Sequence, residues 1–326
     1  MQTPLPSAKK PNATALRHIS QTHDWTARHD RAAPLFCVLA IVAFTLLDRA
    51  APNLVLAAAL VLFMAGIPHG ATERLDGPDA AFGTSGRAKR PTLSYTAIYI
   101  VFGILVMASW LISPLATLIC FLLLSAWHFG RAEPKALGTT AQYLVGLWVI
   151  AGSFLVYPEQ TLGIFRLLIG AEPLSAQTEI TLFGVPSPLL AQGLAATIGL
   201  GLLIQLLTRR PVSLAGARLI TLVAVFICLP PIPAVAVYFF VLHSLRETAA
   251  TIDALPANPL SWLKVYAPAS LPALFGAAGL LALTALGLIP LMLASGLALA
   301  FITPHMLPLE RLTQTAMRDA VGERSM

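Results

Sequence analysis

Charged residues are scarce in this 326-residue chain. Only 11% of its residues are Asp, Glu, Lys or Arg, whereas 57% are apolar. A soluble globular protein carries about 25% charged residues, so this chain has too few charges to cover the surface of soluble domains. Its mean hydropathy of +0.77 suits a chain that folds in lipid. The shortage of charge excludes a soluble or a disordered protein and predicts a polytopic membrane protein.

Cysteine is also rare. The three cysteines, Cys37, Cys120 and Cys228, lie in apolar runs, and no CxxC pair is present. We therefore expect inert buried thiols, and neither a disulfide framework nor a thiolate metal site. A signal peptide is not expected either, because residues 1–32 are polar and contain no cleavable apolar core.

Long apolar runs fill most of the remaining chain. A membrane span needs about 20 apolar residues, and the runs predict an all-α bundle of about ten transmembrane helices over residues 33–308. A polar tail at 1–32, expected to be disordered, precedes the bundle, and a second tail at 309–326 follows it. The predicted spans are 33–48, 51–68, 93–112, 114–130, 138–156, 189–207, 216–230, 232–250, 268–287 and 289–306. A shorter segment at 160–171 is expected to lie in the membrane interface.

The net charge of +6 does not indicate a nucleic-acid partner, because the cations lie in short segments between the apolar runs. Their distribution instead indicates how the chain is oriented in the membrane. If the N-terminus is inside, 19 of the 21 Lys and Arg residues fall in inner segments, and only Arg49 and Arg166 fall outside. Lys and Arg concentrate in cytoplasmic loops. We therefore expect a multi-pass protein of the cell (inner) membrane with both termini cytoplasmic.

Four of the seven histidines, His69, His128, His243 and His305, end the second, fourth, eighth and tenth predicted spans. These spans all run towards the cytoplasm, so the four rings are expected at a similar depth. An interhelical hydrogen bond explains any one of them equally well. Ionisable groups within a membrane nevertheless tend to mark a function, and imidazole is a common metal ligand. Together the four predict a centre for iron, copper or zinc.

The other three histidines, His18, His23 and His29, lie in the polar tail and are expected to be solvated and without a role.

A glutamate follows each of the four span-end histidines after four or five residues. These glutamates are Glu73, Glu133, Glu247 and Glu310. Four residues along a helix return to the same face, so such a carboxylate either accepts the imidazole N–H and orients the ring or binds the metal itself. An interfacial ion pair with a nearby arginine, such as Arg131 beside Glu133, is the alternative.

The four histidines lie in short motifs: Pro68-His69-Gly70-Ala71, His128-Phe129-Gly130, His243-x-x-Arg246 and Pro304-His305-Met306. In this order, each at a span end, the motifs resemble those of the Brp/Blh family of membrane β-carotene 15,15′-dioxygenases, over about residues 34–310. The resemblance implies a non-haem Fe²⁺ enzyme that uses O₂ to cleave β-carotene, or a related carotenoid, at its central double bond to give retinal. It also implies that His69, His128 and His243 are iron ligands.

The chain departs from the family pattern in two places. The family's next ligand is typically a histidine four residues after the one that matches His243, and this position is Glu247. Either Glu247 replaces that imidazole, or His305 completes the set, or the chain is a divergent member with an altered substrate or metal. The acidic residues after the first two motifs are commonly aspartate in the family and are Glu73 and Glu133 here.

Aromatic residues close in sequence to two of the histidines are candidates for lining a polyene tunnel, although ordinary packing explains each of them equally well. They are Trp127, Phe129, Tyr238, Phe239 and Phe240. Arg246 either stabilises the carboxylates near the site or extends its guanidinium to the cytoplasmic face. No general acid or base is required, because the metal activates oxygen while the protein fixes geometry and excludes water.

Two other functions remain open. A haem-binding membrane electron carrier would usually place paired histidines at two depths. A multi-span transporter would show polar groups at mid-span or inverted repeats. The single depth of the histidines and the apolar mid-spans favour the oxygenase, whose partners would be a carotenoid, O₂ and the lipid bilayer.

Overall fold

The computed structural model describes residues 24–71, 93–171, 181–182, 185–208, 213–254 and 259–307. Within these ranges the chain is helical apart from one antiparallel pair of two-residue strands, β1 (Thr181–Leu182) and β2 (Val185–Pro186). The prediction of an all-α fold is confirmed. Most of the first predicted tail and all of the second lie outside the described residues.

The helices follow the predicted spans closely. Helix α5 (Leu93–Ile112) has the bounds of the third predicted span, and α6 (Pro114–Ala132) begins where the fourth begins. The other α-helices are α2 (Trp25–Ala50), α3 (Val55–Gly66), α7 (Gly138–Ala151), α8 (Pro158–Leu168), α9 (Ser187–Leu207), α10 (Leu214–Cys228), α11 (Pro231–Val237), α12 (Leu245–Ala254), α13 (Pro259–Ala285) and α14 (Leu291–Met306). The short 3₁₀ helices are η1 (Pro52–Leu54), η2 (Ile67–Ala71), η4 (Lys135–Leu137) and η5 (Gly152–Leu155), and η6 (Tyr238–Ser244) is a π-helix.

Proline marks the start of several helices. Pro114, Pro158 and Pro231 are the first residues of α6, α8 and α11. A proline is tolerated there because the first N–H groups of a helix have no carbonyl partner within it. Pro114 thereby sets the tight corner between the antiparallel helices α5 and α6.

Helix α2 begins eight residues before the predicted span. Asp24 caps it by accepting the N–H of Ala27 at 3.1 Å. Asp253 of α12 accepts the N–H groups of the first two helical residues at 2.8 Å. These acceptors satisfy donors that a helix start would otherwise leave unpaired. Residues 25–32, assigned to the tail by the sequence, are therefore helical.

The outer surface of the bundle is apolar. Val61, Leu207 and Phe275 are each more than 70% exposed, as suits side chains that face lipid. Within the described residues, five helical segments are long and apolar enough to cross a membrane: Trp25–Ala50, Pro52–Gly70, Pro114–Ala132, Lys135–Leu155 and Ser187–Leu207. They indicate that the protein associates with a membrane. The ten spans and their orientation stay predictions.

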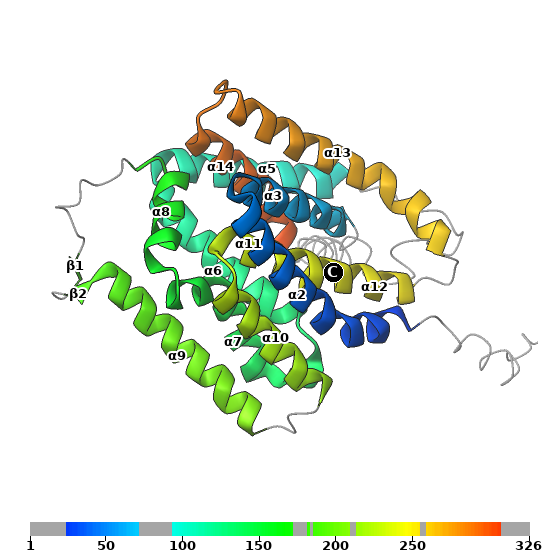
Figure 1. Cartoon of the computed structure of the whole chain (residues 1–326). Coiled ribbons are helices and arrows are strands. Elements are labelled where there is room, and N and C mark those ends of the chain that lie inside the picture. The colour runs from blue at the N-terminus through cyan, green and yellow to red at the C-terminus, as the bar shows by residue number, and fades with distance from the viewer. Residues whose placement is uncertain are drawn as a thin grey trace, which may run out of the picture.

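Helices α13 and α9 lie along opposite edges of the bundle, and most of the other helices lie between them (Figure 1). The main core joins α2, α3, α7, α9, α10, α11 and η6, and a smaller core of Trp110, Leu118 and Leu299 joins α5, α6 and α14. Helices α6 and α7 pack closely because a Cβ at Gly146 would collide with the backbone of Ala126. Helix α6 therefore stands between the two cores.

Candidate metal centre

The four span-end histidines come together from four separate elements. His69 lies in η2, His128 in α6, His243 in η6 and His305 in α14. The ring centroids of His69 and His243 are 4.8 Å apart, and those of His128 and His243 are 5.4 Å apart. The ring of His305 is 5.7 Å from that of His69 and 5.8 Å from that of His128. We call these four residues the histidine cluster.

The ring of His69 is held by the backbone turn that precedes it. Its Nδ1 lies 2.6 Å from the carbonyl oxygen of Gly66 and 3.1 Å from Oγ of Ser244. A carbonyl only accepts hydrogen bonds, so the proton sits on Nδ1 and the lone pair on Nε2. That Nε2 lies 3.2 Å from Nε2 of His243. The turn therefore directs Nε2 of His69 into the cluster, towards His243.

The ring of His243 is carried by the π-helix η6 and is 2% exposed. A π-helical turn is rare and frequently lies at a functional site. Two of its carbonyls are bound from outside: Nε2 of His29 donates to Val241 at 2.7 Å, and Nη2 of Arg218 donates to Leu242 at 2.8 Å. These donors fix the turn directly before His243.

Two glycines make room for the cluster. A Cβ at Gly66 would lie 2.6 Å from the ring of Phe239 and 2.8 Å from Oγ of Ser244. A Cβ at Gly70 would lie 3.3 Å from the ring of His305. The glycine after His69 thus permits α14 to bring its imidazole close, and Gly66 permits η6 to approach α3.

Aromatic rings surround the cluster on the side of η6 and α3. The centroid of Phe129 is 5.1 Å from that of His243, and the ring of Tyr238 stacks on His243 at 6.3 Å. Phe239 stacks on Phe63 at 4.4 Å and meets the edge of His69 at 5.1 Å. These contacts enclose the His69–His243 pair in an apolar wall.

A buried ion pair lies beside the π-helix. Nε of Arg218 lies 2.5 Å from Oε2 of Glu133, and Nη2 lies 2.9 Å from Oε1, so the guanidinium holds the carboxylate with two bonds. The hydroxyl of Tyr238 lies 3.4 Å from the same carboxylate. Asp30 extends the network, since its Oδ1 lies 4.0 Å from Nη1 of Arg218 and 3.2 Å from Nε of Arg246. Such an arrangement satisfies charges that would be costly to bury alone.

A comparison with known families now adds to this geometry. A family model described as beta-carotene 15,15′-dioxygenase matches residues 58–309, a range that contains the whole histidine cluster. The chain belongs to this family. Comparisons with curated proteins and with solved structures gave no match. The predicted family and the enzyme class, a carotenoid dioxygenase-like enzyme, are confirmed, so the family assignment argues against the transporter and the haem carrier.

The predicted tunnel residues fall in two groups. Phe129, Tyr238 and Phe239 contact the histidine cluster. Trp127 instead lies under the guanidinium of Arg131, 4.7 Å from its carbon, and Phe240 packs against the main core. A role for any of them in binding substrate stays a prediction.

One charged residue near the cluster pairs differently from the alternative that the sequence left open, and another follows one of its two alternatives. Glu133 binds Arg218 on another helix, whereas the alternative was its neighbour Arg131. Arg246 bonds Asp30, the carbonyl of Ala132 at 3.1 Å and Oε1 of Glu247 at 3.5 Å. Its guanidinium is therefore held within the bundle, among carboxylates. Glu73 and Glu310 lie outside the described residues.

Sequence reasoning missed three residues that support the histidine cluster. The expectation that His29 is solvated was wrong, because its side chain is 8% exposed and bonds Val241. Asp30 was assigned to the tail, and Arg218 was counted as a cytoplasmic-loop cation although it lies buried in α10. A signal was present in each case: a charged side chain beside an apolar run is costly to bury without a partner.

Proposed function

We propose that this family member is an iron-dependent oxygenase that cleaves β-carotene, or a related carotenoid, at its central double bond with O₂. In that reaction the C=C bond breaks and each of its carbons takes one oxygen atom from O₂, so two retinal molecules form without a further co-reactant. The convergence of four imidazoles from four helical elements, two of them buried, is the observation that carries the proposal.

The donor set of the histidine cluster fits iron. Imidazole nitrogen suits iron, copper and zinc better than the oxygen-seeking magnesium or calcium. Two imidazole nitrogens bound to one ion at about 2.1 Å each lie roughly 3.0–3.4 Å apart, and the Nε2 atoms of His69 and His243 are 3.2 Å apart. Among the described residues, no group of three or more His, Cys, Asp or Glu side chains is already assembled as a metal site. We infer that the rings turn slightly when the ion binds.

We propose His69, His128, His243 and His305 as the ligands. The ring of His305 lies within 6 Å of two other members of the cluster, whereas Oε1 of Glu247 faces Arg246. This arrangement favours His305 over Glu247 as the residue that completes the set.

Glu133 and Arg246 are proposed to orient the cluster through other residues. Glu133 fixes the guanidinium that bonds the carbonyl next to His243. Arg246 ties α12 to α2 and to the end of α6 through Asp30 and Ala132. Together they hold the helices that carry His243 and His128 in register.

The side chains of the protein supply position and a dry site. When bound, iron supplies the redox chemistry by which O₂ reacts with a double bond. Nδ1 of His69 donates its proton to the carbonyl of Gly66, so Nε2, which faces His243, would be the atom that binds the metal. The rings of Phe129 and Phe239 exclude water beside the cluster, which protects a reactive site from side reactions.

Expression in a β-carotene-accumulating bacterium tests the function. We expect the orange colour to fade and retinal to appear in the extract, and the purified protein to contain iron. His69→Ala, His128→Ala, His243→Ala and His305→Ala should each lose iron and retinal formation, whereas His23→Ala, which removes a histidine of the N-terminal segment, should keep both. Iron that survives all four substitutions would show that the cluster is not the metal site.

The choice of the fourth ligand is tested separately. We expect Glu247→Gln to keep its iron and His305→Ala to lose it. The reverse result would assign the position to Glu247.

We also propose that the chain crosses the inner cell membrane about ten times with both termini in the cytoplasm. The distribution of Lys and Arg supports this orientation. A green fluorescent protein fused to the C-terminus should fluoresce, because that reporter folds in the cytoplasm. An alkaline phosphatase fusion that is active at the same point would contradict the orientation.

A further inference from the structure

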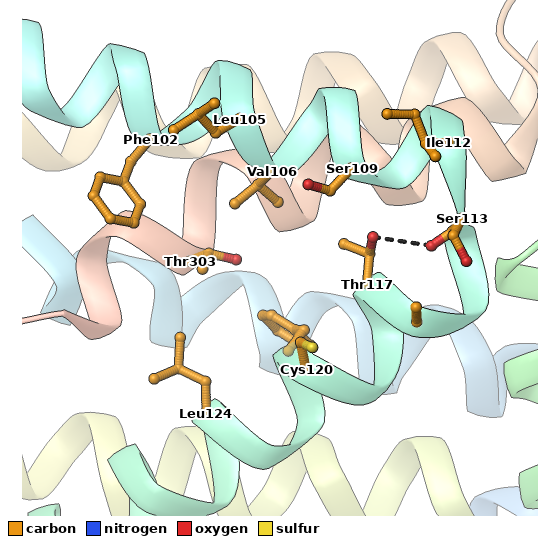
Figure 2. A pocket seen from close by; sticks show the side chains of 12 residues that line it. Phe102, Leu105, Val106, Ser109, Ile112, Ser113, Thr117, Cys120, Leu124 and Thr303 are labelled. Atoms are coloured by element: carbon orange, nitrogen blue, oxygen red, sulfur yellow. Dashed lines mark hydrogen bonds between the residues drawn. The ribbon is translucent and has the colours of Figure 1, made fainter.

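A long cavity of about 520 Å³ lies between α5, α6 and α14. Its lining comes mainly from α5 and α6, with Thr303 of α14 between them (Figure 2). Figure 2 shows Ile112 and Ser113 at one end and Phe102 and Leu124 at the other. We call this cavity the α5–α6 groove. None of the five predicted tunnel residues lines it.

The lining of the α5–α6 groove is mostly apolar, with the hydroxyls of Ser109 and Ser113 as exceptions, and its two threonines are bonded within their own helices. The Thr117 hydroxyl donates to the carbonyl of Ser113 at 3.0 Å, and the Thr303 hydroxyl donates to that of Leu299 at 2.7 Å. Each hydroxyl is thus satisfied by its own helix and presents its methyl group. A ligand that needs no hydrogen bonds suits such a surface.

The groove points towards the histidine cluster. Its lining positions on α6 recur every three or four residues, at Ala116, Cys120 and Leu124, which is the spacing of one helix face. The next position of that face is His128, four residues after Leu124. On α14, Thr303 precedes His305 by two residues, so the two side chains lie on different faces of that helix. One end of the groove therefore lies about one helical turn from one member of the cluster, His128.

The groove is long and open along its side. From Ser113 to Leu124 it follows 11 residues of helix, which span about 16 Å at the helical rise. This length suits an extended hydrocarbon chain. Leu105 and Ile112, on its α5 wall, are 56% and 85% exposed, so the groove opens where the bundle meets lipid.

We propose that the α5–α6 groove holds one arm of the extended polyene substrate, which enters from the bilayer and reaches the histidine cluster with its central double bond. This assignment rests on the proposed function and names the site where the substrate binds. The mostly apolar lining, the course along α6 and the position of His128 on the same helix face favour a long hydrocarbon as the ligand.

A substitution that fills the groove tests the assignment. Ala116→Phe adds a ring to the α6 wall, and Ser109→Leu fills the α5 wall independently. Ala278→Phe is the matched control, because it lies on exposed α13 next to Gly279, where an added Cβ meets no atom within 4 Å. Each protein is purified from β-carotene-accumulating cells under argon, so that bound pigment is not consumed. We then measure the absorbance of bound carotenoid per polypeptide. After air is admitted, we measure the absorbance of the retinal that forms.

We expect wild type and Ala278→Phe to retain carotenoid within two-fold of each other, and both groove variants to lose at least ten-fold while keeping their iron. Equal amounts of pigment in all four proteins would overturn the assignment of the groove as the polyene site. A wild-type protein that carries phospholipid and no pigment would also overturn it. If the groove variants lose pigment but wild type forms no retinal in air, the groove stands and the proposed reaction fails.

Discussion

The two sides of the histidine cluster are built differently. On the side of η6, α2 and α10, polar contacts fix the backbone: His29 and Arg218 bond consecutive carbonyls, and Glu133 holds the guanidinium. On the side of α5 and α14, apolar contacts dominate, and an open groove leads along α6 towards His128. The first side uses buried ion pairs to hold the histidines in place, whereas the second side leaves an open groove. This division suits a centre that must position a metal yet admit a large apolar molecule.

The largest effect is expected where the polar side loses a charge. Arg218→Met leaves the carboxylate of Glu133 buried without its partner, and breaking a buried ion pair in this way costs about 3–5 kcal/mol. We expect a large fall in the midpoint of thermal unfolding in detergent and the loss of iron.

A double variant distinguishes the effect of the buried charges on stability from the effect of Arg218 on the position of His243. Arg218→Met combined with Glu133→Leu removes both charges, and replacing a buried pair by apolar residues is often neutral. We expect most of the thermal stability to return while iron affinity stays low, because the bond to Leu242 next to His243 is still absent. If iron affinity also returns, Arg218 acts on stability alone.

A smaller effect is expected at His29. His29→Phe keeps a ring but removes the Nε2 donor to Val241. One net hydrogen bond is worth about 1 kcal/mol, so we expect iron affinity to fall about five-fold, as measured by titration with a competing chelator. Arg31→Ala on the same helix is the control, because its pair with Asp24 is exposed on both sides and such pairs contribute little. Equal iron affinity in both variants would show that His29 does not support the π-helix.

The sequence predicts the helices and the histidine cluster better than it predicts what supports them. Hydropathy places α5 correctly because span length and apolar content are local properties. The four histidines are found because polar residues are rare in apolar runs. The bond from His29 to Val241 joins residues 212 apart in sequence, and the pair of Arg218 with Glu133 joins residues 85 apart. No local pattern predicts such partners, since they depend on how the helices pack.

Neither the π-helix nor the groove could be predicted from the sequence, because both depend on how the helices pack. Nothing in the run Tyr238–Ser244 distinguishes a π-helical turn from an α-helical one, and the turn is fixed by donors from α2 and α10. In the sequence, the apolar positions of α6 that line the groove have the pattern of an ordinary packing face. Only the separation of α5 from α6 makes them a cavity.

The smallest effect is expected at Thr303, which tests whether the open side is apolar in function as well as in shape. Thr303→Val keeps the branched shape and removes a hydroxyl that bonds only the carbonyl of Leu299 within its own helix. That carbonyl already takes part in the helix, so the bond is dispensable. We expect kcat/KM for carotenoid cleavage to stay within two-fold of wild type. A ten-fold loss, with iron retained, would mean that the hydroxyl contacts a reacting group, and the contrast between a polar and an apolar side of the cluster would fail at a residue that lines the groove.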